Sequence, residues 1–156
     1  MPERWIGIVV GSDKVTVVDA EVPKSGPLVI QGDHSWPLQK GGRAAGYSVV
    51  HQQVTDYCQE NQIARAVIKA SALSLRGTKK AHLEAAELRG VVISAAATIT
   101  ETELLSKAVV SRTFGRRSAD EYLEDDEFWR REVSGGRLRG GSREAALMLL
   151  AARSGQ

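Results

Sequence analysis

The sequence predicts one α/β domain over residues 1–156, in which a three-stranded antiparallel meander is extended by parallel strands, with helices on both faces. Strand-like runs at 5–10, 15–22 and 28–31 follow one another through short turns, and strands joined so tightly must be antiparallel neighbours. Helical and strand-like runs then alternate, which is typical of parallel strands joined by crossover helices. A chain of 156 residues is long enough to bury the core of one such domain.

The composition is that of an ordinary globular protein, with 42% hydrophobic and 26% charged residues. The net charge of +2 does not by itself indicate a nucleic-acid partner, so only a local basic patch would. The single cysteine, Cys58, excludes an internal disulfide and fits a reducing cytoplasm. No secretory signal opens the sequence and no apolar run is long enough to span a bilayer. We therefore expect a cytoplasmic protein without membrane contact.

The opening hairpin is the clearest local signal. Residues 5–10 are apolar throughout, as in a strand buried on both faces, and the Gly-Ser-Asp-Lys turn at 11–14 leads into 15–22. The third strand is expected to be short, at 28–31, because Gly32 and Asp33 follow it. A loop is then expected as far as Gly42.

A helix is expected at about 43–61, because Val50, Val54, Tyr57 and Cys58 fall on one face. Beyond it we expect a strand at 64–70, a loop at 71–77, a long helix at 78–96 and a short strand at 98–99.

Two capping boxes predict the helices that follow. Thr100-Glu101-Thr102-Glu103 predicts a helix start, and Ser118-Ala119-Asp120-Glu121 predicts another helix that runs to about residue 131. The glycine-rich basic segment 134–142 is expected to be flexible, and a final helix is expected at 143–153.

Several stretches, in this order, resemble one protein family. They are Ile-Gly-Ile-Val-Val-Gly at 6–11, Ala-Val-Ile-Lys at 66–69, the small-residue helix at 85–97, the Lys-rich and glycine-containing stretch at 106–121, and Ser-Arg-Glu-Ala-Ala-Leu at 142–147. The chain resembles the RuvC-type branch of the ribonuclease-H-like superfamily, and within it a small uncharacterised bacterial group. The resemblance implies a ribonuclease-H-like fold and the homodimer in which RuvC-like proteins often occur.

The resemblance also implies an active site, from which this sequence departs. In the active family, three or four carboxylates hold two divalent metals that bind the scissile phosphate and activate water. Here Val9 stands at the first-strand Asp position, Lys69 at the fourth-strand Glu position, and Gly141 and Glu144 at the final-helix pair. A lysine would repel a metal, and we expect Lys69 to form an ion pair with Glu144. The resemblance therefore implies a degenerate site with no metal and no cofactor.

Three functions follow as alternatives. The leading one is a catalytically degenerate accessory factor that binds nucleic acid or a protein partner through the former active-site edge. The second is a magnesium-dependent nuclease with a rearranged carboxylate set, made by Asp13, Asp19, Glu84 and Glu144. The third is a structural subunit without nucleic-acid contact. By their positions alone, Asp13 is more typical of a turn, and Asp19 and Glu21 of a solvated strand face.

Basic side chains cluster in the loops that the resemblance places around the active-site edge. The candidate nucleic-acid contacts are Arg76, Lys79, Lys80, Arg112, Arg116, Arg117, Arg137, Arg139 and Arg143. Arginines on glycine-rich loops are suited to contact phosphates, whereas the sparse aromatic residues argue against base stacking as the main mode of binding.

Overall fold

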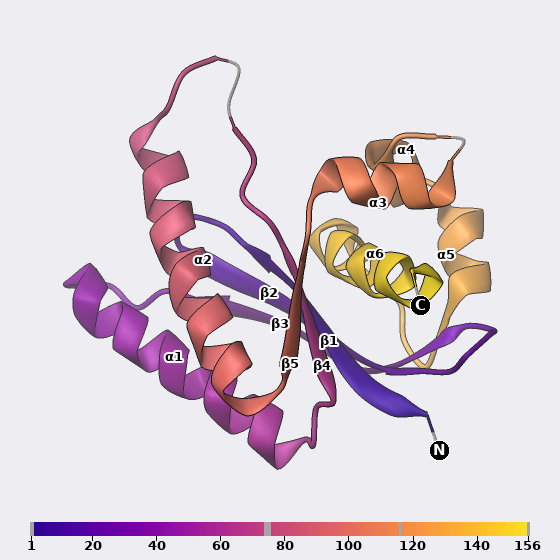
Figure 1. The fold of residues 1–156 in the computed structure, drawn as a ribbon, viewed down its shortest axis with the longest axis horizontal. Coiled ribbons are helices and arrows are strands. Elements are labelled where there is room, and N and C mark those ends of the chain that lie inside the picture. The colour runs from indigo at the N-terminus through magenta and orange to yellow at the C-terminus, as the bar shows by residue number, and fades with distance from the viewer. Residues whose placement is uncertain (1, 74–75, 116, 156) are drawn as a thin grey trace.

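The computed structural model describes residues 2–73, 76–115 and 117–155, and its centre is a mixed six-stranded sheet with helices on both faces (Figure 1). The elements in chain order are β1 (Glu3–Val10), β2 (Lys14–Val22), β3 (Leu28–Pro37), α1 (Arg43–Glu60), β4 (Arg65–Lys69), α2 (Lys80–Ile99), β5 (Glu101–Leu105), α3 (Lys107–Phe114), α4 (Ala119–Leu123), α5 (Asp126–Glu132), β6 (Val133–Ser134) and α6 (Gly140–Ser154).

The strand pairing confirms the predicted fold class. The sheet order is β5-β4-β1-β2-β3-β6. β1, β2 and β3 form the antiparallel meander, whereas β4 runs parallel to β1 and β5 runs parallel to β4. β6 adds a short parallel pair to β3 at the other edge. The crossover helices α1 and α2 precede β4 and β5, as parallel pairing requires.

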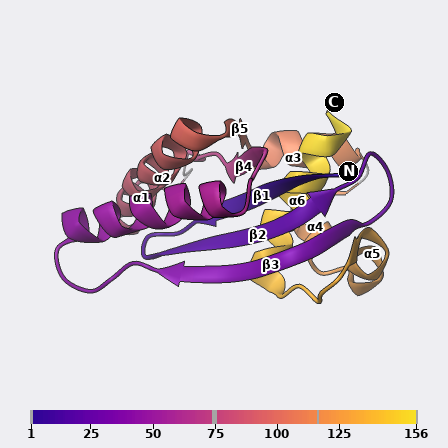
Figure 2. The same ribbon diagram turned by 90° about the horizontal axis from the view of Figure 1, so that it is seen from below.

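Side-chain alternation divides the core into two layers. Ile6 and Ile8 point to the face of the sheet that α1 and α2 cover. Figure 2 shows these two helices beside the sheet after a 90° turn of the molecule. Val18 and Leu147 belong to the opposite layer, which α3, α4, α5 and α6 cover. Gly7 lies where α6 crosses β1, because a Cβ there would come within 2.1 Å of the Ala145 carbonyl oxygen. Within the described ranges, no helix is both long and apolar enough to cross a bilayer.

β3 is longer than predicted. The strand continues through Gly32 and Asp33 to Pro37, and the register with β2 shifts by a bulge between Asp19 and Ala20. A Cβ on Gly32 would lie 2.7 Å from the His34 Nε2 atom, so glycine here provides space inside the strand. The expected end of the strand at Gln31 was wrong, because this glycine belongs to a bulge and not to a turn.

The helix expected to start at Thr100 was also wrong. α2 continues to Ile99, which replaces the short strand expected at 98–99, and β5 begins at Glu101. The next helix, α3, starts directly after β5, and the side chain of the intervening residue, Ser106, accepts a hydrogen bond from the Val109 amide. Pairing of β5 with β4 prevails over the local capping pattern, since strand propensity depends on the neighbouring strand.

The C-terminal third differs in its boundaries. The predicted capping box at Ser118 is confirmed, but the helix it opens ends at Leu123. A second helix, α5, starts after Asp125, whose carboxylate accepts a hydrogen bond from the Phe128 amide. β6 and the first residues of α6 occupy part of the segment expected to be flexible, so the final helix begins at Gly140.

Candidate functional site at the amino end of α6

An ion pair lies where β4 ends and α6 begins. The Lys69 Nζ atom is 3.1 Å from the Glu144 Oε1 atom, and each side chain is 25% exposed. This contact confirms the ion pair expected from the sequence. The ion pair forms because the Lys69 side chain, at the end of β4, lies on the face of the sheet that α6 covers. Glu144 lies one turn into that helix.

The other positions singled out by the resemblance lie beside this pair. β1 and β4 are in register at Ile8 and Ile68, so the residues that follow, Val9 and Lys69, are neighbours. Val9 is half-buried against the core layer that contains α6. Gly141 lies in the first turn of α6, one turn before Glu144. Among these four described residues Glu144 supplies the one carboxylate, which is already paired with an ammonium group, and this set does not fit a divalent metal ion.

The four carboxylates of the nuclease alternative lie in separate places. Asp13 is exposed in the turn between β1 and β2. Glu84 pairs with Arg43 at 3.1 Å, between α2 and α1. Glu144 alone lies on the face covered by α6. Across residues 2–73, 76–115 and 117–155, no three Asp, Glu, His or Cys side chains are placed to hold a metal ion.

Asp19 is fully buried, so the expectation of a solvated strand face was wrong for this residue. Its carboxylate accepts hydrogen bonds from the Arg4 guanidinium and, at 2.6 Å, from the Tyr57 hydroxyl. The hydrogen bond to Asp19 raises the pKa of Arg4. Burial, followed by the contact with Asp19, raises the pKa of Tyr57. Asp19 lies on the α1 face of the sheet and balances Arg4 there, which is a structural role.

A second group of polar side chains lies on the α6 face, and apart from Arg139 its members were not found from the sequence. The Ser142 hydroxyl donates a hydrogen bond to the Asp33 carboxylate, and Arg139 lies 3.6 Å from the same carboxylate. Thr16 pairs with Ser35 across β2 and β3. Alternation of Asp33 and Ser35 along an extended β3 is the signal that identifies these residues, and it is lost if the strand ends at Gln31.

A hollow of about 120 Å³ lies at this position, against the start of α6. Its lining residues are Lys14, Thr16, Ser35, Arg139, Gly141 and Ser142.

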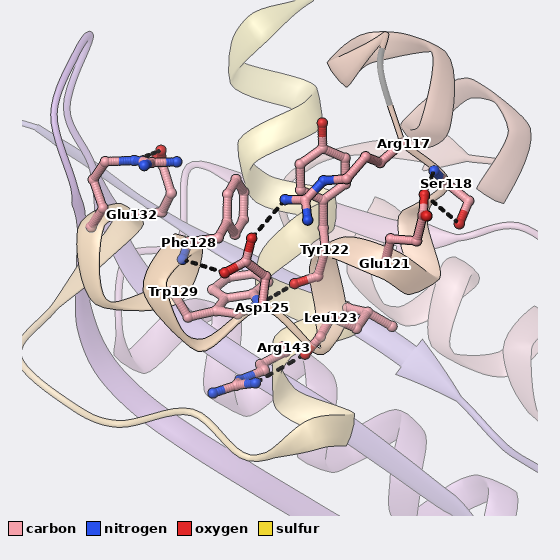
Figure 3. Close-up of polar contacts among 11 residues, drawn as sticks. Arg117, Ser118, Glu121, Tyr122, Leu123, Asp125, Phe128, Trp129, Glu132 and Arg143 are labelled. Atoms are coloured by element: carbon pink, nitrogen blue, oxygen red, sulfur yellow. Dashed lines mark hydrogen bonds and ion pairs between the residues drawn. The ribbon is translucent and has the colours of Figure 1, made fainter.

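Two of the predicted basic contacts are held inside the C-terminal third (Figure 3). Arg117 pairs with Asp125 at 2.8 Å and lies over the Tyr122 ring, with its guanidinium carbon 4.2 Å from the ring centre. Arg143 donates to the Leu123 carbonyl oxygen and pairs with Asp126, both at 2.8–2.9 Å. These contacts hold α4 and α5 together and to α6, so both guanidinium groups already have acidic partners within the protein.

Other members of the basic set remain available to a partner. Arg112 and Arg137 are exposed and form no ion pair within the part of the chain that the structure describes. Lys79 and Lys80 are exposed at the start of α2. Arg76 is exposed but not free of contacts, and Arg116 lies outside the described residues. A larger hollow, of about 370 Å³, lies beside α5 and is lined by Asp126, Trp129, Arg130, Val133, Gly136, Arg137, Leu138 and Arg143.

Comparison with known proteins identifies the architecture. No protein-family model and no curated protein matches the chain. Among solved structures, Thermus thermophilus RuvC in complex with Holliday junction substrate has a TM-score of 0.71 at 11% identity, covering 98% of this chain and 96% of that one. The yeast mitochondrial Holliday junction resolvase Ydc2 has a TM-score of 0.58 at 14% identity, covering 98% of this chain and 80% of that one.

The fold is RuvC-type. The match spans nearly the whole chain and supports the ribonuclease-H-like fold predicted from the sequence. Membership of the small bacterial group stays a prediction. In this RuvC-type fold, the Lys69–Glu144 pair and the 120 Å³ hollow flank the first turn of α6 on the β4 and the β2–β3 sides.

Proposed function

We propose that this protein binds nucleic acid without cleaving it, through the surface around the amino end of α6. The observation that carries the proposal is the Lys69–Glu144 ion pair. The Lys69 ammonium group at the end of β4 forms an ion pair with the Glu144 carboxylate on α6. That carboxylate is then not free to bind a metal. Two-metal cleavage needs several carboxylates converging on the metals.

The partner is inferred from charge and from the structural relatives. Arg137 and Arg130 line the hollow beside α5, and Arg112 is exposed at the end of α3. Guanidinium groups pair well with phosphate, and such contacts supply most of the affinity that does not depend on base sequence. One relative of the same fold was solved on a Holliday junction, so a branched DNA is the first ligand to test.

The test uses the full chain with a four-way junction, a duplex and a single strand of shared sequence. Binding is measured at several salt concentrations between about 50 and 200 mM, the range over which phosphate contacts lose affinity steeply. We expect binding that weakens with salt, and a double Arg137→Ala, Arg139→Ala variant that binds about tenfold less and has a shallower salt slope by about 1–2. Lys24→Ala is the matched control, because Lys24 is exposed in the turn after β2, at the opposite end of that strand from Thr16.

Cleavage is measured on the same substrates with magnesium or manganese. We expect none. Metal-dependent cleavage that disappears in Glu144→Ala would overturn the non-catalytic proposal in favour of the nuclease alternative. Salt-insensitive or absent binding would overturn the nucleic-acid proposal and leave a protein partner or a structural subunit as the function.

A further inference from the structure

The 120 Å³ hollow beside the start of α6 is built from groups that favour an anion. Lys14 and Arg139 supply two cationic side chains, and Thr16 and Ser35 supply hydroxyl groups, whereas the Ser142 hydroxyl already donates to Asp33. No carboxylate lines it. The Asp33 carboxylate contacts two of the lining residues, because it accepts a hydrogen bond from the Ser142 hydroxyl and lies 3.6 Å from the Arg139 guanidinium.

The first turn of α6 adds backbone donors. The first intrahelical bond runs from the Arg143 amide to the Arg139 carbonyl oxygen, at 2.8 Å. The amides of Gly140, Gly141 and Ser142 precede it, and none has an acceptor within the described residues. No side chain caps this end and no acidic residue lies in the first turn. The amino end of this 15-residue helix therefore has free backbone donors, and the Asp33 carboxylate bound to the Ser142 hydroxyl is the negative charge beside them.

Thr16 gives an independent indication of a ligand. The residue is only 8% exposed, it lines the hollow, and its hydroxyl has no hydrogen-bond partner within the described residues. The hydroxyl oxygen is not among the fully enclosed side-chain atoms that lack a partner, so it remains accessible from the hollow and is free to donate there. An acceptor in the hollow would receive a hydrogen bond from Thr16.

We propose that this hollow binds one phosphate group, held by the free amides of α6, the Thr16 hydroxyl and the side chains of Lys14 and Arg139. The chemistry is that of a tetrahedral oxyanion at a helix amino terminus. The inference rests on the proposed function for the source of the phosphate, which is then a backbone group of the nucleic acid. A small phosphorylated molecule carries the same chemistry, and the test separates the two sources.

The direct probe is inorganic phosphate, followed by nuclear magnetic resonance of the backbone amides, with sodium chloride at equal ionic strength as the reference. We expect saturable shifts at Gly140, Gly141 and Ser142 with phosphate and not with chloride. Gly141→Pro removes one free amide without breaking an intrahelical bond, because proline is tolerated in the first turn. It should weaken phosphate binding about tenfold, as the loss of a hydrogen bond to a charged group does.

Lys24→Ala is the control, because Lys24 is exposed in the turn after β2 and does not line the hollow, and it should bind phosphate as the unaltered protein does. Thr16→Val keeps the side-chain shape and removes the hydroxyl, so it should also weaken binding, and it gives a second reading if the proline variant does not fold. Two results would overturn the phosphate site. One is a set of shifts that do not saturate with phosphate, and the other is a phosphate affinity in Gly141→Pro and Thr16→Val equal to that of the control variant.

The two sources give different outcomes. If the phosphate belongs to nucleic acid, Gly141→Pro and Thr16→Val weaken junction binding as well as phosphate binding. If phosphate binds but no nucleic acid does, the site is retained with a small phosphorylated ligand, and the proposed function fails. If nucleic acid binds with no response of the hollow to phosphate or to these variants, the site fails and the proposed function stands.

Discussion

The carboxylate of Asp19 is enclosed by the sheet and α1, and its charge is balanced by Arg4. Removing one partner of a buried ion pair leaves the other without compensation, which costs more than the pair contributes. The Arg4 side chain is 30% exposed, so water solvates its guanidinium group when Asp19 is removed. This lowers the free-energy cost of losing the pair. The Tyr57 hydroxyl supplies a second hydrogen bond to the same carboxylate.

Replacing these side chains should destabilise the fold in a graded way. We expect Asp19→Ala to lower the free energy of unfolding by about 3 kcal/mol, because Arg4 and Tyr57 both lose their acceptor. Tyr57→Phe should cost about 1 kcal/mol, the usual value of one hydrogen bond. Urea unfolding followed by circular dichroism measures both. Asp13→Ala, in an exposed turn, is the control, and an equal loss there would contradict the structural role of Asp19.

At the scale of elements, α6 packs closely on the sheet where it crosses β1. Gly7 in β1 permits it, since the backbone of Ala145 fills the space that a side chain would need. α6 is buried along most of its length, at Ser142 and from Ala145 to Ala152. The position of its first turn, and so of the candidate site, depends on this contact.

A methyl group at Gly7 should therefore displace α6. We expect Gly7→Ala to lower the free energy of unfolding by at least about 1–3 kcal/mol, the range for overpacking a core, and to weaken phosphate binding at the start of α6. Thermal unfolding and the phosphate titration measure the two effects. Gly90→Ala is the matched control: Gly90 is exposed in α2 with nothing near its Cβ position, and alanine there should stabilise by about 0.5–1 kcal/mol. A neutral Gly7→Ala would contradict the close packing.

Elements and site were predictable where the signal is local or follows from strand order. The apolar β1, the buried stripe of α1 and the Ser118 cap are local signals. Lys69 meets Glu144 because parallel pairing and a final covering helix bring them together. Neighbouring strands of the sheet determine the pairing of β5, the bulge at Gly32 and the burial of Asp19. Local sequence patterns do not contain this information. Thr16, Ser35 and Asp33 were missed for the same reason.

For the whole molecule, ionisable groups buried in the α1 layer connect stability with pH. Burial, with a smaller contribution from the charge of Asp19, raises the pKa of Cys58 to about 11 from the ordinary value of 9.0. The raised pKa of Tyr57 acts in the same direction. Both groups hold their protons more tightly in the folded state, so the stability they contribute is complete below pH 9 and is lost as the pH rises.

The free energy of unfolding should accordingly fall between about pH 9 and pH 11. The rise in the Cys58 pKa from 9.0 to about 11 corresponds to about 3 kcal/mol, at about 1.4 kcal/mol for each unit of pKa, and about 2 kcal/mol of this is lost by pH 11. Urea midpoints at pH 8, 9, 10 and 11 measure it. In Cys58→Ala the decline should be shallower by that amount, because only the other groups still titrate. Parallel declines in the two proteins would contradict the buried thiol.

The burial of α6 has a consequence for how a ligand is met. The first turn of this helix cannot shift without disturbing the core layer beneath it, so the donors at its start are held in place before any partner arrives. Little conformational entropy is then lost on binding, and affinity is gained without new contacts. Substitutions among the residues that line the hollow should consequently alter the lifetime of the complex with the ligand far more than the rate at which that complex forms.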